Sequence, residues 1–291
     1  MLWIVSAAAI WATLGPMSKI AIEHGLPAAE SSFWRSLIAW ICFGLHAVLT
    51  NETKLSLRNR SVLLVFGFVG VSLFYMANVF AVEKAGAGLA CILLYSAPVW
   101  VAIFSHFLFN EKLTRRKIIA ISITIVGVAG VALLGPTAQF RPKPEGILWG
   151  LVAGVTYSQY YFLPRVLKGS VKTSTIFLYV FPTGCLGLLP FFNFRLLNLT
   201  QFAIVFYLGC VATYVPYLCY YRGLRKTNVV QASVLACVEP VVANIIAVLA
   251  FNEVFSIYGY LSIVLVLVGI LVMVTSNKKL NLKKKIARDS I

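Results

Sequence analysis

Long apolar runs separated by short polar segments recur along the whole 291-residue chain. A helix needs about 20 residues to cross a bilayer, and runs of about that length can be marked ten times. Strand-like alternation is absent, and lipid offers no partners for open strand edges. The pattern therefore predicts an all-α integral membrane protein with ten transmembrane helices, at residues 2–22, 31–49, 61–82, 86–108, 117–134, 145–164, 173–193, 201–222, 229–251 and 257–276.

A fourteen-residue block occurs twice in the chain. The first copy begins at Pro98 and the second begins 142 residues later, at Pro240. Six of the fourteen positions are identical, and both copies end in Phe-Asn-Glu. The chain therefore contains a duplicated unit, and because each unit holds five spans, an odd number, the two repeats are expected to be inverted. The predicted parts are a first repeat at 1–135, a second repeat at 145–276 and a basic cytoplasmic tail at 277–291.

Lys and Arg residues are concentrated in the loops that would share one side of the membrane. Short cytoplasmic loops carry such an excess, so both termini are predicted to be cytoplasmic. The turn at Asn110 and Glu111 would then lie inside, and the matching turn at Asn252 and Glu253 would lie outside. The first run contains Lys19 and is expected to be a retained span.

Composition excludes several classes of protein. Apolar residues make up 60% of the chain and charged residues 12%, far from the roughly 25% charged residues of a soluble domain. The net charge of +16 resides in short loops and the tail, so no nucleic-acid partner is expected. The six cysteines fall in apolar runs without close pair spacing, and neither a metal nor another cofactor is predicted.

The reactive side chains argue against an enzyme. The sole Asp is Asp289 in the tail, the three His are scattered, and no metal-protease or nucleophile-elbow motif occurs. A phosphate-binding loop of an ATP-driven pump is also absent. Any transport would therefore draw its energy from a gradient.

The repeated blocks and the segments around them resemble a known family. The runs that carry the resemblance are Leu94-Tyr-Ser-Ala-Pro-Val, Phe109-Asn-Glu-Lys-Leu-Thr-Arg-Arg, Val126-Gly-Val-Ala-Gly and Val238-Glu-Pro-Val-Val. They are similar to EamA-type members of the drug/metabolite transporter superfamily. The resemblance covers nearly the whole chain and implies two inverted five-helix repeats that move small metabolites, often amino acids or related compounds, commonly outward.

We therefore predict a secondary transporter in the cell membrane that exports amino acids or related metabolites by alternating access. The resembled family also contains importers of nucleotide-like and sugar-like solutes, and a receptor or scaffold that transports nothing is a further alternative. The expected partners are a small-molecule substrate and the lipid bilayer, and proton coupling is an open alternative. Fused repeats need no second chain to complete their symmetry, so a monomer is sufficient.

Glu239 lies near the middle of the span at 229–251, where a charged side chain costs roughly 2.5–3.5 kcal/mol. It is a candidate for cargo binding or proton coupling, and the alternative is a carboxyl that organises the core through hydrogen bonds. Pro98 and Pro240 each remove a backbone hydrogen bond and are predicted to kink their spans. These kinks are candidate gating hinges, with static packing as the alternative.

Aromatic and amide side chains recur at helical spacing within several spans. Tyr75 corresponds to Tyr217 by the 142-residue offset, and this pair is expected to line a central cavity. Amphipathic rings suit a pathway that holds organic molecules weakly. The same substrate-binding role is predicted for Trp11, Asn78, Tyr95 and Tyr157, with ordinary packing as the alternative.

Lys19 and Arg35 approach the external ends of their spans. They could form an outer gate or an anion-attracting vestibule, and Lys19 could contribute to coupling. For Arg35 we favour extension of the side chain towards the lipid headgroups.

Three further pairs of residues match between the repeats. Thr114 and Ser256 are expected to be helix N-caps, because each begins an apolar run two residues or so after Phe-Asn-Glu. Glu111 and Glu253 are accordingly interpreted as turn residues. Gly127 and Gly269 are predicted to permit close helix packing.

Overall fold

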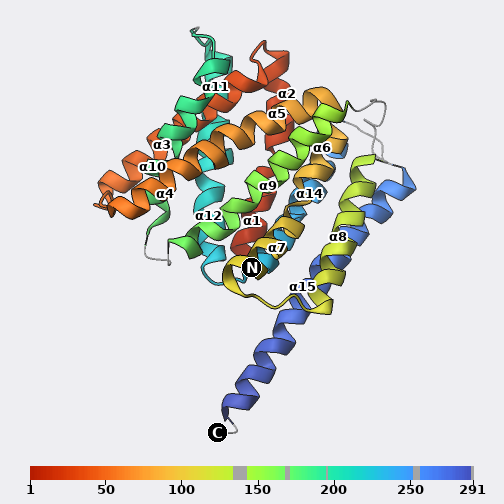
Figure 1. Ribbon diagram of the computed structural model, residues 1–291. Coiled ribbons are helices and arrows are strands. Elements are labelled where there is room, and N and C mark those ends of the chain that lie inside the picture. Colours follow the sequence, from red (N-terminus) through yellow and green to blue (C-terminus); the bar gives the residue numbers. More distant parts are fainter. Residues whose placement is uncertain (134–142, 168–170, 195, 252–255, 290–291) are drawn as a thin grey trace.

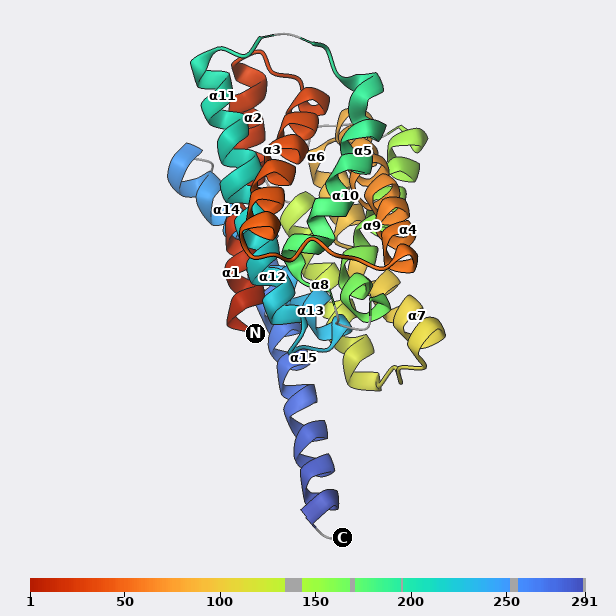
Figure 2. The ribbon, with the colours of Figure 1, turned by 90° about the vertical axis from the view of Figure 1, so that its left-hand side faces the viewer.

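The computed structural model describes residues 1–133, 143–167, 171–194, 196–251 and 256–289, and these form one bundle of helices (Figure 1). Within the described residues there is no strand. The N-terminus lies towards the end of the bundle from which the last helix projects (Figure 2). We call this end, marked by Met1 and by the part of the last helix after Thr275, the tail end.

The helices are short pieces that join into longer segments. Two π-helical stretches, η1 and η3, and one 3₁₀ turn, η2, continue neighbouring α-helices. In chain order the elements are α1 (Leu2–Trp11), α2 (Leu14–Glu23), α3 (Ala28–Leu49), α4 (Leu57–Gly67), η1 (Phe68–Leu73), α5 (Phe74–Ala85), α6 (Ala87–Leu94), α7 (Ala97–Phe109), α8 (Arg115–Leu133), α9 (Pro144–Val166), α10 (Thr173–Leu188), η2 (Leu189–Phe191), α11 (Leu199–Phe206), η3 (Tyr207–Tyr214), α12 (Val215–Leu224), α13 (Val229–Ala236), α14 (Val238–Phe251) and α15 (Ile257–Asp289).

Eight of the helical segments are long and apolar enough to cross a membrane. The segments α8 and α9 are not among these eight. The sequence of α8 begins with three basic residues, and α9 carries six consecutive side chains with polar atoms at 156–161. The all-helical membrane fold is thus confirmed, and the count of ten spans stays a prediction. The last helix also runs further than expected, because α15 continues through the predicted tail to Asp289.

Three of the segments are broken shortly before a proline. The breaks fall at residues 12–13, 95–96 and 237, ahead of Pro16, Pro98 and Pro240. Proline has no N–H to donate to the carbonyl four residues earlier, so the helix cannot continue unchanged. The predicted kinks at Pro98 and Pro240 are therefore confirmed, and both prolines are buried.

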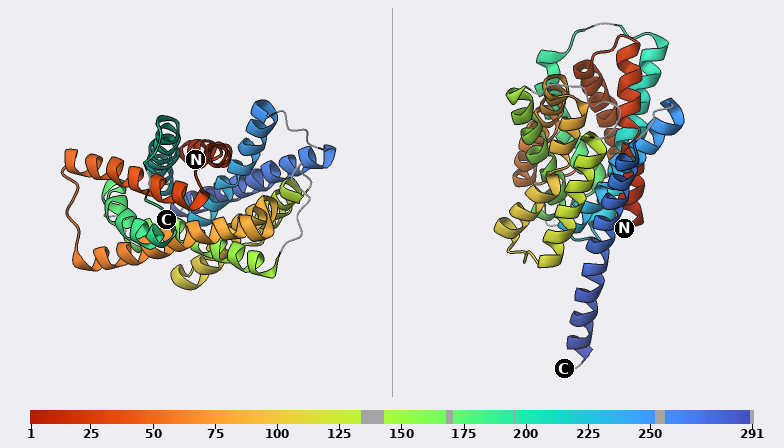
Figure 3. Two further views of the ribbon diagram at one scale, coloured as in Figure 1. Left: turned by 90° about the horizontal axis from the view of Figure 1, so that it is seen from above. Right: turned by 90° about the vertical axis from the view of Figure 1, so that its right-hand side faces the viewer.

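Helices α8 and α15 lie side by side along one edge of the bundle (Figures 1 and 3). A Cβ atom added at Gly127 would lie 2.7 Å from the Val266 backbone nitrogen, and one added at Gly269 would lie 2.9 Å from that of Thr124. The predicted close packing at both glycines is confirmed. These two contacts are repeat equivalents, since 124 and 266 differ by the same 142 residues as 127 and 269. Gly130 faces Ser262, so the two helices run antiparallel.

A second pair of contacts is repeated in the same manner. Gly67, at the end of α4, packs against Val180 of α10. Gly209, in η3, packs against Ile38 of α3, and a Cβ added there would lie 2.6 Å from the Ile38 Cβ. Both members of this contact are shifted by 142 residues. The π-helical stretches η1 and η3 begin within three residues of equivalent positions, so each half carries a π segment beside its partner helix.

The predicted N-caps are also confirmed. The Thr114 hydroxyl accepts a hydrogen bond from the Lys117 backbone N–H at 3.3 Å, and the Ser256 hydroxyl accepts one from the Gly259 N–H at 3.2 Å. These caps fix the starts of α8 and α15, whose glycines then meet.

Candidate functional site

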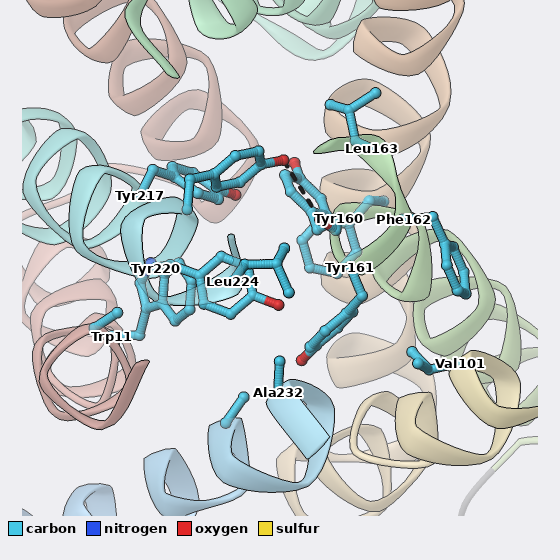
Figure 4. Close-up of a cluster of buried hydrophobic side chains, with 14 of the residues drawn as sticks. Trp11, Val101, Tyr160, Tyr161, Phe162, Leu163, Tyr217, Tyr220, Leu224 and Ala232 are labelled. Atoms are coloured by element: carbon cyan, nitrogen blue, oxygen red, sulfur yellow. Dashed lines mark hydrogen bonds between the residues drawn. The ribbon is translucent and has the colours of Figure 1, made fainter. Parts of the chain in front are cut away.

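A cluster of buried aromatic side chains fills the middle of the bundle. Figure 4 shows Tyr160 and Tyr161 of α9 facing Tyr217 and Tyr220 of α12, with Trp11 of α1 beside them. The Tyr160 and Tyr217 rings stack with centroids 5.4 Å apart, and Tyr161 meets Tyr220 edge to face at 5.6 Å. Trp11 lies 5.4 Å from Tyr217 and 5.3 Å from Tyr220. The cluster therefore connects helices from both halves of the chain.

Arg35 forms a polar centre next to this cluster. Its Nε donates to the Thr213 hydroxyl at 2.8 Å, and a terminal nitrogen donates to the Tyr75 hydroxyl at 2.8 Å. The Tyr75 hydroxyl is in turn within hydrogen-bonding reach of Tyr217. The prediction that Arg35 extends towards the headgroups is wrong, because the guanidinium turns inward to two hydroxyls that outcompete the interface. The predicted Tyr75–Tyr217 pair does meet in the core.

Glu239 supplies the opposite charge. The break at Cys237 places this residue in the first turn of α14, where the backbone N–H groups favour a carboxylate. Tyr95, at the end of α6, contributes a hydrogen bond to the carboxylate, and Arg35 lies within electrostatic range of it. Glu239 and Arg35 do not form a salt bridge among the described residues. The core thus contains a separated pair of opposite charges.

The other residues predicted for the site fall at different depths. Tyr157 stacks on Phe74 with centroids 5.3 Å apart and lies near Glu239. Asn78 is half-buried one turn beyond Tyr75 on α5. Lys19 is exposed on α2 and lies outside the buried aromatic cluster. The structure therefore gathers Trp11, Tyr75, Tyr95, Tyr157, Tyr217 and Glu239 in the interior. Their roles in binding, and that of Lys19 in coupling, stay predictions.

Comparison with known proteins identifies the kind of molecule that carries this site. A family model described as the EamA-like transporter family matches residues 1–133 and 144–275. The chain belongs to this family. It is therefore a multi-pass membrane transporter and not an enzyme, as the inventory of reactive residues predicted.

Relatives of this EamA-like transporter have similar lengths. An uncharacterized transporter of Clostridium kluyveri is 26% identical over 260 residues, which cover 84% of this chain and 81% of the relative. The uncharacterized transporter YetK of Bacillus subtilis is 26% identical over 290 residues, covering 94% and 87%. A solved structure described as "Crystal structure of protein" superposes with a TM-score of 0.80 at 19% identity, covering 95% of this chain and 97% of that chain. The last similarity concerns the fold alone.

At the tail end of this EamA-like transporter, Glu111 joins three helices. One carboxylate oxygen bonds Arg165 of α9. The other accepts a hydrogen bond from the Asn228 side chain at 3.0 Å and lies 3.6 Å from the Lys117 ammonium of α8. We call these four residues the Glu111 network. Glu111 is thus more than the turn residue that was predicted, because it ties the first half to the second. The matching predictions for Asn252 and Glu253 lie outside the described residues.

Replacing Glu111 by Ala is expected to lower the free energy of unfolding by roughly 3 kcal/mol, because the nearly buried Lys117 would lose its counter-charge. Chemical denaturation of the detergent-solubilised protein measures this change. Glu145→Ala is the matched control, since Glu145 pairs with Lys84 at an exposed site and should matter little. Equal unfolding midpoints for Glu111→Ala and the unmodified EamA-like transporter would contradict a stabilising role of the network.

A second carboxylate links the halves in the loop between α3 and α4. The Ser174 hydroxyl donates to Glu52 at 2.7 Å, and the Lys172 ammonium lies 3.7 Å away. The hydrogen bond from Ser174, together with the charge of Lys172, lowers the pKa of the Glu52 carboxyl. The Thr175 hydroxyl also donates to the Glu52 backbone carbonyl.

Several residues of the site were not found from the sequence. Thr213 holds Arg35 across 178 residues of chain, and no local pattern marks such a partner. Tyr160, whose hydroxyl donates to the Gly70 carbonyl at 2.5 Å, belongs to the run of polar side chains at 156–161. That run, set within an otherwise apolar helix, was the available signal.

Proposed function

We propose that this membrane transporter is a secondary carrier that exports amino acids or related small metabolites across the cell membrane. The observation that carries the proposal is the separated charge pair of Arg35 and Glu239 beside an aromatic wall. Each intramembrane charge costs roughly 2.5–3.5 kcal/mol, so such residues are kept for a function. A carrier for organic molecules with polar groups needs both features, because the rings hold the organic part and the charges orient it.

The transport mechanism that we propose is alternating access between two inverted five-helix repeats, residues 1–135 and 145–276. Contacts that recur with a 142-residue shift between antiparallel helices α8 and α15 support a two-fold axis in the membrane plane. In such carriers the two repeats exchange conformations around a fixed site. The helix breaks before Pro98 and Pro240 are the proposed gating hinges, since each lies beside a residue of the site, Tyr95 or Glu239.

We further propose that both termini are cytoplasmic and that a monomer carries out transport. The basic loops support this orientation, and the N-terminus and the projecting part of α15 share the tail end of the bundle. Glu239 is proposed to couple cargo movement to protons, because a carboxyl in the core can exchange a proton as the site opens to either side.

Reconstitution into proteoliposomes tests the function. Vesicles containing the purified protein would be loaded with a panel of amino acids, sugars and nucleotides, and efflux followed with and without an imposed proton gradient. We expect saturable efflux of one or more amino acids that the gradient accelerates. Flux of sugars or nucleotides alone would reject the proposed cargo, and a folded protein that moves nothing in the panel would reject the function.

Replacing Tyr217 by Ala is expected to raise the KM for cargo about tenfold, because the ring makes aromatic contacts worth roughly 0.5–1.5 kcal/mol each. Tyr217 contacts Trp11, Tyr160 and Phe177, so its loss also opens the wall of the site. The conservative variant Tyr217→Phe keeps the ring and should stay near the original KM. The concentration dependence of flux measures both variants, and an unaltered KM in Tyr217→Ala would return this ring to a packing role.

A further inference from the structure

The guanidinium of Arg35 has more donors than its protein partners use. Arginine carries five N–H groups in a planar fork, and the hydrogen bonds to Thr213 and Tyr75 occupy one on Nε and one on a terminal nitrogen. Both partners are neutral hydroxyls. Among the described residues, Arg35 takes part in none of the salt bridges. An inward-facing cation thus keeps donors and a full charge for another group.

The two hydroxyls hold the fork in a fixed orientation. Thr213 is fully buried, and its own O–H donates to the Leu208 carbonyl in η3 at 2.7 Å, which leaves its lone pairs for the Arg35 Nε. Tyr75 is almost fully buried, and its ring also lies under the guanidinium carbon at 4.5 Å from the centroid. A planar cation held on one edge and one face is pre-organised to receive an anion on its remaining edge.

We propose that Arg35 is the specificity-determining residue that binds an oxyanion of the cargo, foremost a carboxylate. This inference rests on the proposed function and narrows the cargo to molecules with an anionic oxygen group. A carboxylate matches the guanidinium fork by two parallel N–H···O bonds, and a phosphate shares this chemistry. Glu239, which interacts with Arg35 only across a distance, disfavours a second bound carboxylate and leaves room for a cationic group on the same molecule.

Direct binding of matched probes tests the inference without relying on flux. The probes are phenylalanine, 3-phenylpropionate, phenyl phosphate and phenylalaninamide, of which the amide alone lacks an oxyanion. Their affinity for the purified protein would be followed by quenching of tryptophan fluorescence and by the shift of the thermal unfolding midpoint. We expect at least one oxyanion probe to bind about tenfold or more tightly than the amide, because a charged hydrogen-bond pair would be lost with the amide.

The Arg35→Gln variant should remove this preference, and Arg35→Lys should retain part of it, because the charge remains while the fork is lost. Arg60→Gln is the matched control. Arg60 also lies over a tyrosine ring, that of Tyr179 at 5.5 Å, but away from the site, and its replacement should leave the preference unchanged. Unfolding midpoints without probe show whether each variant is folded. If Arg35→Gln does not fold, the acid-to-amide ratio of the original protein and of Arg35→Lys decides.

Binding of phenyl phosphate in preference to the carboxylates would identify phosphate as the source of the oxyanion and support the inference. Equal binding of acid and amide by the original protein, binding of no oxyanion probe, or an unchanged preference in Arg35→Gln would overturn it. These outcomes differ from failure of the proposed function, which is an absence of flux in reconstituted vesicles. A protein that transports neutral molecules and ignores oxyanions would keep the function and lose the inference.

Discussion

Replacing Gly127 by Leu is expected to prevent stable folding. The backbone nitrogen of Val266 lies so close that even a Cβ at residue 127 would be 2.7 Å from it, and backbone cannot give way as a flexible side chain can. Gly127→Ala alone should cost roughly 1–3 kcal/mol of stability, and the larger side chain more. Because Gly269 makes the repeat-equivalent contact with Thr124, Gly269→Leu should have the same effect.

Membrane expression and monodispersity in detergent measure this result. Gly15 offers the matched control, since a Cβ added there would meet nothing within 4 Å. Gly15→Ala should be neutral or slightly stabilising, because alanine is the better helix former by roughly 1 kcal/mol. Normal folding of both Gly127→Leu and Gly269→Leu would mean that α8 and α15 do not pack as described.

Replacing Glu239 by Gln is expected to reduce gradient-driven flux about tenfold or more and to flatten its dependence on pH. Glutamine keeps the volume and the hydrogen bond available to Tyr95 but can neither release a proton nor carry a charge. A loss of one decade corresponds to about 1.4 kcal/mol, a modest share of the interaction energy of a charge within the membrane. Flux into proteoliposomes at several external pH values measures both effects.

Glu145→Gln serves as the control for this experiment. Glu145 forms an exposed ion pair with Lys84, so its loss should leave the pH profile of flux unchanged. An unchanged profile in Glu239→Gln, at full surface expression, would remove this carboxyl from coupling and leave it as a structural group bonded to Tyr95.

Features with a local physical cause could be predicted from the sequence. The helix breaks at Pro98 and Pro240 follow from the missing N–H, and the close approach at Gly127 and Gly269 follows from the missing side chain. The 142-residue offset then paired Tyr75 with Tyr217 before any contact between them was known. Local chemistry and internal symmetry were therefore sufficient for much of the fold.

Features that depend on distant partners could not be predicted in this way. Arg35 lies near the end of its span, where an arginine usually extends to the headgroups, and only the position of Thr213 on η3 shows that it turns inward. The π segments were equally hidden: Pro216 follows η3 and gives a weak signal, but η1 is followed by Phe74. Glu111 gained its role from Arg165 and Asn228, which the chain reaches much later.

The most direct test of the account asks whether the two halves face opposite ways. Thr114 and Ser256 are equivalent N-caps, one in each half. The Thr114→Cys and Ser256→Cys variants would be labelled separately with a membrane-impermeant thiol reagent, in intact cells and in inside-out vesicles, with the parent protein as background. We predict labelling of the first only in inside-out vesicles and of the second only in intact cells. Labelling of both from the same side would contradict inverted repeats, and with them the carrier described above.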